Sequence, residues 1–390
     1  MALPALLLHA AFALAFLPAP AAAPPRAFAP GFVETVVADG LDSPVSMTVA
    51  PDGRIFVCEQ GGALRVIKRG QLLATPFWVA PTQAFMEEGL LGVALDPGFA
   101  RNGFVYVCYT ALEPVRHERV VRLVAEGDEA MAHSEITLLE LDAHEAHLHV
   151  GGGLRFGRDG MLYVGTGDND RGELAQSLRS TFGKLLRIRP DGAIPTDNPF
   201  VRETEGRHRA IWARGLRNAF TFDVQPGTGR MFVNDVGNSA WEEVNHVAAG
   251  ANYGWPAYEG PNGRPGYRLP VHAYSHEHGC AITGGAFYSP ARPAFPREWL
   301  GRYLYADYCR SEIRWLDPEN SENFHVFGVT GVPGPVDLRV GPDGRLYVLV
   351  RGSSAPTGGE HSSRGAVLRI APGKAPVTRE KTLGGRPGTP

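Results

Sequence analysis

Residues 157–168 read GRDGMLYVGTGD, a Gly-containing turn followed by a strand-like run with a Tyr near its centre. Variants of this phrase recur along the chain as PDGRIFVCE from Pro51, DPGFARNGFVYVCYT from Asp96, QPGTGRMFVNDVG from Gln225, EWLGRYLYADY from Glu298 and GPDGRLYVLV from Gly341. Repeats of about 40 to 70 residues, each holding several short strands, cannot bury both faces of a sheet alone and pack best around a central axis. The six copies therefore predict an all-β fold, a six-bladed β-propeller over residues 32–372.

Other features of the chain agree with this fold. Short apolar runs such as KLLRIRP and EIRWLDP lie between the copies, and extended helical periodicity is nearly absent. Gly-rich segments suit a crowded channel where strand ends converge. A β-sandwich or a pair of smaller β domains stays open as the alternative, although no linker between Phe32 and Pro372 indicates a domain boundary.

Composition limits the kind of partner. The 390 residues are 44% hydrophobic and 20% charged, which is enough apolar sequence for a large core. A formal charge of −3 and a pI near 6.5 give no electrostatic reason to expect nucleic acid or an anionic membrane as partner. We expect a ligand that is small and close to neutral.

The two ends of the chain differ from the rest. Residues 1–23 are an Ala- and Leu-rich run that ends in small residues, which is typical of a secretory signal peptide, although a Lys or Arg near Met1 is missing. The run is shorter than the roughly 20 residues of a membrane-spanning helix, so export is favoured over an anchor. No later segment is apolar enough to span a bilayer, and residues 373–390 are expected to be disordered. We expect a periplasmic or secreted protein.

Cysteine usage agrees with export. The four cysteines, Cys58, Cys108, Cys280 and Cys309, occur singly and lack the C-x-x-C spacing of zinc or redox sites. Proximity along the chain favours the pairs Cys58–Cys108 and Cys280–Cys309. Four free buried thiols are the alternative.

A candidate general base lies in HLHVGGGLRFGRDGMLYVGTGD, residues 147–168. His149 precedes three glycines, and a hairpin that folds back on itself would return Asp168 toward it. A carboxylate beside an imidazole fixes its tautomer and favours its protonated form, as a general base requires. A structural role for a lone His beside glycines stays open.

Two further stretches concentrate polar residues. In IWARGLRNAFTFDV, Arg217 could stabilise a developing oxyanion and Asn218 could orient a polar ligand, with a surface ion pair and a capping amide as the alternative. The stretch NDVGNSAWEEVNHVAAGANYGWPAYEG offers Glu242, Glu243 and many main-chain carbonyls, the hard oxygen donors that calcium prefers.

Two groups of histidines lie in DAHEAHLHVG and VHAYSHEHGC, namely His144, His147, His149, His272, His276 and His278. Neither group has a zinc-site spacing on a helix. All of them except His149 are expected to be solvated loop side chains.

Together these stretches resemble the glucose/sorbosone dehydrogenase family, the soluble pyrroloquinoline-quinone (PQQ) aldose dehydrogenases, which also includes hedgehog-interacting-protein-like propellers. The resemblance runs from about Phe32 to Ile370, and its landmarks stand in family order. They are EEGLLGVALDPGFARNGFVYV, HVGGGLRFGRDGMLYVGTGD, GKLLRIRPDGAIPTDNPF, GLRN, DVGNSAWEEVNHVAAGANYGWP, GCAITGGAFY and GRYLYADYC. The resemblance itself implies a six-bladed propeller.

The resemblance also implies roles for individual residues. His149 matches the His that takes a proton from the anomeric hydroxyl of the sugar as hydride moves to the quinone, and Asp168 matches the acidic residue that supports it. Arg217 and Asn218 match the pair that contacts the cofactor and the substrate region.

Calcium is implied at two places. Main-chain carbonyls of Gly237 and Asn238 match those that hold the calcium that activates PQQ. Glu243 and Tyr253 match the residues of a separate structural calcium.

The chain departs from the family pattern around the cofactor. Glu87 stands where cofactor-using members place a Gln just before GLLG, and Leu148 stands where Asn or Asp is common. A negative charge at position 87 is unfavourable near a tricarboxylate. Cys309 replaces a Lys, and Gly334 to Val336 replace Arg residues. Candidate replacement cations are Arg310, Arg339 and Arg351.

The resemblance implies an exported, PQQ- and calcium-dependent oxidoreductase that oxidises aldose sugars at the anomeric carbon to lactones and uses an external electron acceptor. A non-enzymatic extracellular binding propeller with a degenerate cofactor site is the alternative, and the missing cations favour it. A third reading is a calcium-dependent lactonase, which predicts a metal held by side chains at the channel centre.

Overall fold

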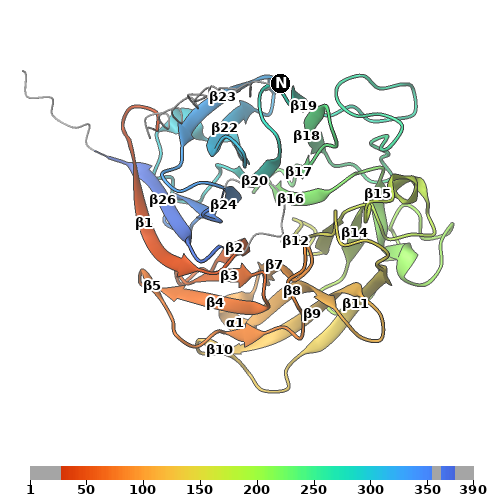
Figure 1. The fold of residues 1–390 in the computed structure, drawn as a ribbon, viewed down its shortest axis with the longest axis horizontal. Helices are drawn as coiled ribbons and strands as arrows, with labels where there is room; N and C mark the ends of the chain where they lie inside the picture. The colour runs from red at the N-terminus through yellow and green to blue at the C-terminus, as the bar shows by residue number, and fades with distance from the viewer. Residues whose placement is uncertain (1–27, 354–361, 374–390) are drawn as a thin grey trace, which may run out of the picture.

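The protein is a ring of six antiparallel β-sheets around a central axis (Figure 1). The first strand of each sheet packs against the first strand of the next, and we call the narrow space that these strands line the channel. The structure is a computed structural model that describes residues 28–353 and 362–373. Its strands run from Phe32 to Pro372. The expected signal peptide, residues 1–23, and all but the first residue of the expected disordered tail, residues 373–390, lie outside the described residues.

Each sheet is one blade, and its strands follow one another along the chain. Blade 1 contains β2 (Pro44–Val49), β3 (Ile55–Glu59), β4 (Ala63–Lys68), β5 (Gln71–Leu72) and β6 (Trp78–Val79). Blade 2 contains β7 (Leu90–Leu95), β8 (Phe104–Ala111), β9 (His117–Glu126), β10 (Glu129–Ala130) and β11 (Ile136–Ala143). Blade 3 contains β12 (Gly151–Phe156), β13 (Leu162–Thr166), β14 (Lys184–Ile188) and β15 (Ile211–Arg214).

The second half of the ring repeats this plan. Blade 4 contains β16 (Ala219–Val224), β17 (Met231–Asp235), β18 (Trp241–His246) and β19 (His272–Ser275). Blade 5 contains β20 (Ile282–Phe287), β21 (Tyr303–Asp307), β22 (Glu312–Asp317) and β23 (Asn320–Val329). Blade 6 contains β24 (Pro335–Val340), β25 (Leu346–Val350), β26 (Gly365–Pro372) and β1 (Phe32–Leu41).

The six-bladed prediction is confirmed, and its physical basis is visible. The six copies of the repeated phrase become the second strand of each blade, namely β3, β8, β13, β17, β21 and β25. The turn before each of these strands reverses the chain after the first strand, which lines the channel. The number of copies of the repeat therefore predicts the number of blades, because each blade contains one such turn.

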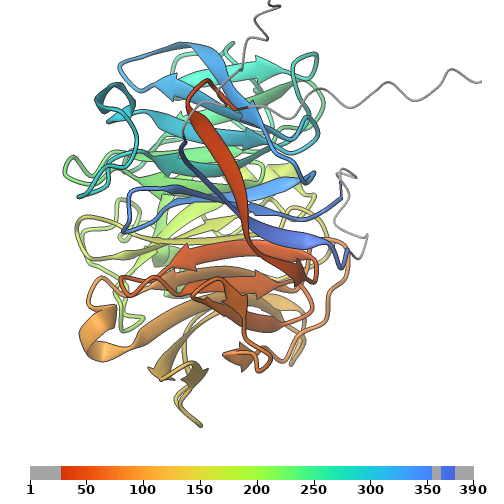
Figure 2. The ribbon, with the colours of Figure 1, turned by 90° about the vertical axis from the view of Figure 1, so that its left-hand side faces the viewer.

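The ring is closed by the two ends of the described chain. Strand β1 pairs antiparallel with β26, so the first strand of the sequence is the outer strand of the last blade (Figure 2). Each channel-lining strand also packs against the next, including β24 against β2. This closure leaves blades 1 and 6 side by side although they lie at opposite ends of the sequence.

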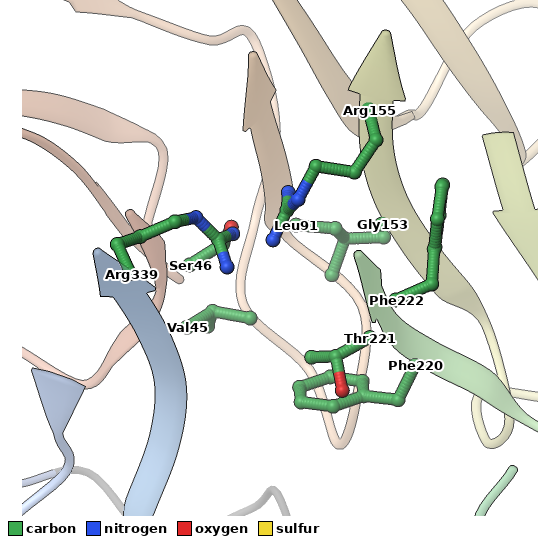
Figure 3. A pocket seen from close by; sticks show the side chains of 9 residues that line it. All are labelled: Val45, Ser46, Leu91, Gly153, Arg155, Phe220, Thr221, Phe222 and Arg339. Atoms are coloured by element: carbon green, nitrogen blue, oxygen red, sulfur yellow. The ribbon is translucent and has the colours of Figure 1, made fainter. Parts of the chain in front are cut away.

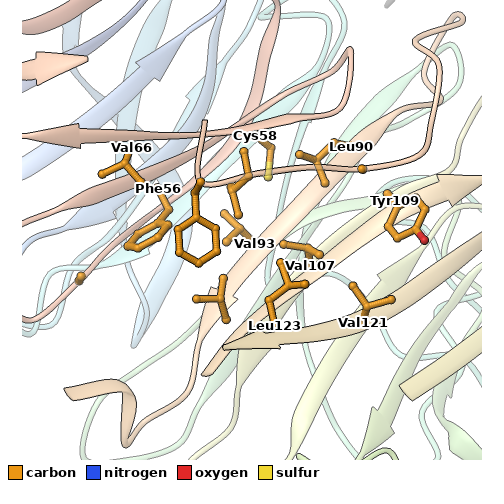
Figure 4. Packing of buried hydrophobic residues seen from close by; sticks show 14 of the residues in the cluster. Phe56, Cys58, Val66, Leu90, Val93, Val107, Tyr109, Val121 and Leu123 are labelled. Carbon is orange, nitrogen blue, oxygen red and sulfur yellow. The ribbon is translucent and has the colours of Figure 1, made fainter. Parts of the chain in front are cut away.

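Within the described residues, the core consists of six hydrophobic clusters, one between each pair of neighbouring blades. Figure 4 shows the cluster between blades 1 and 2, where Phe56 and Val66 meet Val93, Val107 and Leu123. Successive side chains of a strand point to opposite faces, so every blade contributes to two clusters.

This alternation explains why one expected disulfide is wrong. Cys280 and Cys309 form a disulfide, as predicted, whereas Cys58 and Cys108 are free and buried. Cys58 belongs to the cluster between blades 1 and 2, and Cys108 belongs to the cluster between blades 2 and 3. The Cys108 side chain points away from Cys58, because it alternates with Val107, which does face blade 1.

Helices are few and short in the described part of the chain. They are α1 (Phe99–Asn102) and the 3-10 helices Gly172–Gln176, Gly206–Ala210 and Arg297–Trp299. None of these helices, within residues 28–353 and 362–373, is long and apolar enough to cross a membrane.

Candidate active site

The predicted catalytic residues meet at one end of the channel, where channel-lining strands begin and second strands end. His149 lies two residues before β12, and Asp168 lies two residues after β13. Arg217 and Asn218 immediately precede β16 of the neighbouring blade. The two blades are joined here, because Asp168 N donates to Arg217 O at 2.7 Å.

Main-chain geometry presents His149 to this end of the channel. His149 has a left-handed φ of 51°, which is uncommon for a residue with a side chain and is frequent at functional sites. The glycines that follow allow close approach of blade 2, since a Cβ on Gly152 would lie 2.4 Å from Leu91 Cβ. Gly167 lies against the carbonyl of His149, where a Cβ would be only 1.9 Å from that oxygen.

The His149 ring is held on both nitrogens. Its Nδ1 lies 2.8 Å from Asp168 Oδ1, and its Nε2 lies 2.8 Å from Arg217 Nη2. A guanidinium only donates, so Nε2 is the acceptor and Nδ1 carries the proton that Asp168 accepts. The predicted proximity of Asp168 is thus confirmed, and the neutral ring has its basic nitrogen directed at Arg217.

Asp168 is itself positioned by a second donor. Its Oδ2 accepts the indole N–H of Trp255 at 2.7 Å, and Asp168 is 1% exposed. The Trp255 ring also lies 5.6 Å from the Arg217 guanidinium carbon, within the range of a cation–π contact.

Arg217 is fixed by neighbouring main-chain groups. Its Nη1 donates to Val236 O at 3.0 Å and to Gly237 O at 2.6 Å. The buried Asp235 carboxylate accepts the main-chain N–H groups of Arg217 and Asn218 at 2.9 and 2.6 Å. The guanidinium therefore bridges the His149 ring and the loop after β17.

The Glu87 carboxylate is already hydrogen-bonded to groups of the protein. Its Oε2 accepts His149 N at 2.9 Å and Asn218 Nδ2 at 3.3 Å. The expected electrostatic conflict with a carboxylate ligand is reduced, because protein donors already engage this charge. Asn218 Oδ1 is buried and has no hydrogen-bond partner within the described chain.

The positions of the missing cations lie at this same end of the channel. Cys309 is in the disulfide with Cys280, and Val336 is buried. Arg351 lies beside them, since Arg351 N donates to Gly334 O at 2.7 Å. Its side chain is buried and donates to Gln60 Oε1 at 2.6 Å. Arg310 is exposed and donates to Glu277 O at 2.7 Å.

Arg339 lies in the channel itself and is not at this end. Figure 3 shows Arg339 and Arg155 converging between the channel-lining strands, around a cavity with room for about one water molecule. Arg339 Nη2 donates to the buried Asp337 at 2.6 Å, and burial followed by the nearby Arg155 lowers the pKa of Arg339 to about 10. The positive charges of these two guanidinium groups would repel the calcium ion that a lactonase would hold at the channel centre.

The residues proposed for a structural calcium lie on blade 4. Glu243 faces Asp235 across β17 and β18, and burial and the mutual repulsion of the two carboxylates raise the pKa of Asp235. Asn245 Nδ2 donates to Glu243 at 2.9 Å, while the buried Asn245 Oδ1 has no hydrogen-bond partner in the described residues. Two adjacent buried carboxylates and an unpaired amide oxygen fit a hard cation such as calcium.

The other predicted calcium ligands are more constrained. The Tyr253 phenol already bonds His246 O at 2.8 Å and Ala248 N at 3.2 Å, so a metal role would fall to its main-chain carbonyl. Gly237 O accepts from Arg217 and keeps a second lone pair. Among the residues that the structure describes, no group of three or more His, Cys, Asp or Glu side chains lies so as to hold a metal.

The expectation of solvated histidines is wrong for several side chains. The His144 ring is buried, with Nδ1 at 3.0 Å from Glu88 Oε1, and His272 is buried in β19. His276 pairs with the buried Glu242 at 2.9 Å. Each of these rings has a partner that lies 33 to 56 residues away in the sequence, namely Glu88, Glu242 or Tyr305, and a linear sequence does not show such contacts. His278 is exposed, as predicted.

Sequence reasoning gave no role to three residues that the structure places around the site. Asp235, Trp255 and Glu259 bond the main chain of Arg217, the side chain of Asp168 and the loop after Gly237, respectively. All three lie in the stretch NDVGNSAWEEVNHVAAGANYGWPAYEG. The signal was its concentration of polar and aromatic residues in irregular, Gly-rich chain.

Comparisons with known proteins agree with this geometry. Residues 41–357 match the family described as Glucose / Sorbosone dehydrogenase. The aldose sugar dehydrogenase YliI of Escherichia coli is 27% identical over 357 residues, covering 86% of this chain and 92% of that protein. The PQQ-bound aldose sugar dehydrogenase of Streptomyces coelicolor superposes with a TM-score of 0.72 at 25% identity, over 88% of this chain and 100% of that one.

One further relative is not named as a dehydrogenase. The hedgehog-interacting protein of mouse is 29% identical over 213 residues, which cover 47% of this chain and 30% of that protein. The family match itself extends over most of the propeller, from the end of β1 past β25. With its six blades and the His149 cluster at the channel end, the chain belongs to the glucose/sorbosone dehydrogenase family.

Proposed function

We propose that the protein is an exported, PQQ- and calcium-dependent oxidoreductase that oxidises aldose sugars at the anomeric carbon to lactones, with an external electron acceptor. The observation that carries the proposal is the His149 ring, whose Nδ1 is bonded to Asp168 and whose Nε2 is an acceptor. The family match and the PQQ-bound relative support the redox chemistry.

The chemistry follows from these contacts. The anomeric hydroxyl of the sugar takes the place of Arg217 Nη2 at His149 Nε2, which accepts the hydroxyl proton. The C–O bond gains double-bond character as the C–H bond breaks, and hydride leaves the anomeric carbon. Asp168 stabilises the imidazolium that forms, because it accepts from Nδ1 throughout. Arg217 remains beside the developing negative oxygen and stabilises it.

The donor set fits a polyanionic quinone. When bound, PQQ would supply the two-electron acceptor for the hydride, and calcium would supply a positive charge that makes the quinone a better acceptor. Arg217 and Arg351 are the cations that would hold its carboxylates, and the unpaired Asn218 Oδ1 would accept an N–H or O–H group. Calcium would take the carbonyls of Gly237 and Asn238, and a second ion would take Glu243 and the carbonyl of Tyr253.

The first test is a titration of the purified mature protein with PQQ in the presence of calcium, followed by an aldose while the quinone absorbance is recorded. Saturable binding with sugar-dependent reduction supports the proposal. Absence of PQQ binding up to millimolar concentration would overturn it.

A second function is favoured by one specific observation. Positions 309 and 334–336 carry no Lys or Arg, and Cys309 is in a disulfide. A non-enzymatic extracellular binding propeller would explain the absence of these cationic side chains. One relative, the hedgehog-interacting protein, is named for an interaction and not for a reaction. Purified protein that binds no PQQ but captures a glycan or a protein would favour it.

A further inference from the structure

The loop after β17 is held by one carboxylate from a distant segment. Glu259 Oε1 accepts four consecutive main-chain N–H groups, those of Asn238, Ser239, Ala240 and Trp241, at 2.8, 3.3, 3.2 and 3.1 Å. Successive N–H groups that converge in this way form a concavity that binds anions. Here the anion is the chain's own side chain.

This contact fixes the direction of the carbonyls on the other side of the loop. In a trans peptide the N–H and the preceding C=O point in opposite directions. The Asn238 N–H points at Glu259, so the Gly237 carbonyl points away from it, toward Arg217 Nη1 at 2.6 Å. The Ser239 N–H likewise directs the Asn238 carbonyl away from Glu259.

Close packing leaves the loop few alternatives. A Cβ on Gly237 would lie 1.6 Å from Trp241 O and 2.8 Å from Glu259 Oε1. The residue after Glu259 also bonds blade 4, because Gly260 N donates to Glu243 at 2.6 Å. Trp255, four residues before Glu259, donates to Asp168. One segment, residues 255–260, therefore contacts both sides of the His149 and Arg217 pair.

We infer that Glu259 is a positioning residue of the active site. It orients the Gly237 carbonyl, which holds Arg217 against His149 Nε2, and it aims the carbonyls of Gly237 and Asn238 at the proposed calcium. The calcium part rests on the proposed function, whereas the orientation of Arg217 and His149 does not.

The test reads the state of the His149 ring without cofactor or metal. Nitrogen-15 spectra of histidine-labelled protein report the tautomer of each ring, and the His149→Gln variant identifies the His149 signals. In Glu259→Ala the loop loses its acceptor and Arg217 leaves Nε2, so the His149 Nε2 signal should shift while the His272 signals stay in place. Glu259→Gln, which keeps an acceptor oxygen, should restore most of the wild-type position.

A matched control is available in blade 6. Glu34 also accepts a loop N–H, that of Gly331 at 3.0 Å, and lies outside the site. Glu34→Ala should leave the His149 signals unchanged. Wild-type His149 signals in folded Glu259→Ala, or an equal shift of all histidine signals, would overturn the inference. If Glu259→Ala does not fold, Glu259→Asp, which is one methylene shorter, should give the same His149 shift, and unchanged signals would again overturn it.

A second measurement addresses the carbonyls. The calcium concentration for half-maximal PQQ binding should rise roughly tenfold or more in Glu259→Ala. It should rise much less in Glu259→Gln. An unchanged calcium requirement together with a shifted His149 signal would overturn the calcium part alone. Wild-type protein that fails to reduce PQQ would count against the proposed function and leave the NMR result standing.

Discussion

The end of the channel that carries His149 has two unlike sides. On blades 3 and 4, His149, Asp168 and Arg217 form a connected set, in which the His149 ring lies 2.8 Å from each partner and Asp168 N donates to Arg217 O at 2.7 Å. On blades 5 and 6, the corresponding edge carries the Cys280–Cys309 disulfide and the buried Val336, with Arg351 beside Gly334.

The difference separates the residues proposed for proton transfer from the edge proposed for cofactor binding. The first side depends on main-chain geometry, including the left-handed His149 and the close contact at Gly167, and it keeps the residues that the resemblance implies. The second side carries no Lys or Arg at positions 309 and 334–336, where the resemblance implies cationic side chains. This chain therefore lacks the implied cations on one side while it keeps the proposed catalytic set on the other.

The largest expected effect tests the first side. His149→Ala removes the proposed base, and sugar-dependent PQQ reduction should fall roughly 1000-fold or more in kcat, because general base catalysis contributes effects of this size. Stopped-flow absorbance after PQQ loading measures it. His147→Gln is the control in the same stretch, with a 37% exposed side chain, and activity within about twofold is expected there. Equal losses in both variants would contradict the assignment.

The next effect tests how the ring is held. Asp168→Asn keeps the size of the side chain but removes the charge that stabilises the imidazolium, so kcat should fall about 100-fold. PQQ affinity should change little, since Asp168 is 1% exposed and bonds His149 and Trp255. Separate measurements of kcat and of PQQ binding distinguish these effects, and a loss confined to binding would contradict the role.

The second side is tested through its cations. Arg351→Gln should weaken PQQ binding about tenfold, because one buried charge pair is removed. The exposed Arg310 should matter less when changed to Gln. The double variant Cys280→Ser, Cys309→Lys places a cation on the depleted edge and should tighten binding. Fluorescence titration measures all three, and equal affinities throughout would remove the contrast between the two sides.

The smallest expected effect is on folding stability, and it distinguishes a loss of activity from a loss of the folded state. His272 lies between blades 4 and 5, where Nδ1 is 3.0 Å from Ser321 O and Nε2 is 3.2 Å from Tyr305 Oη. Burial, and then the Arg314 charge, lower the pKa of His272 to about 4. Between pH 6.5 and 4 the unfolded chain binds a proton that the folded chain does not, so stability falls as the pH falls.

Because of this proton, the free energy of unfolding should be about 1 kcal/mol lower at pH 5.5 than at pH 7. His272→Gln should remove that increment from the pH dependence of unfolding in urea, and the exposed His133→Gln should not. An identical pH dependence in His272→Gln and wild type would contradict the buried neutral ring. A fall in activity at pH 5.5 without a fall in stability would then be assigned to the site.

The repeat in the sequence was sufficient to predict the fold, because each copy specifies a turn and a strand through local preferences. The Asp168 contact was also accessible, since a hairpin returns the end of β13 to the start of β12. The Cys58–Cys108 pairing was wrong because chain proximity does not determine which face of a blade meets its neighbour. The prediction of solvated histidines was wrong for His144 and His276 because each ring pairs with a buried carboxylate that is distant in the sequence.

The sequence by itself determined the number of blades, the turn that presents His149 and the residues that the family pattern identifies. The tertiary structure decided which groups surround them: Arg217 on Nε2, Trp255 on Asp168, Glu259 under the Gly237 loop and Arg351 on Gln60. The physical reason is range. Strand alternation and turns are set by neighbours in sequence, whereas these contacts join residues far apart in the sequence, which only the packing of blades and loops in the folded ring brings within hydrogen-bond distance.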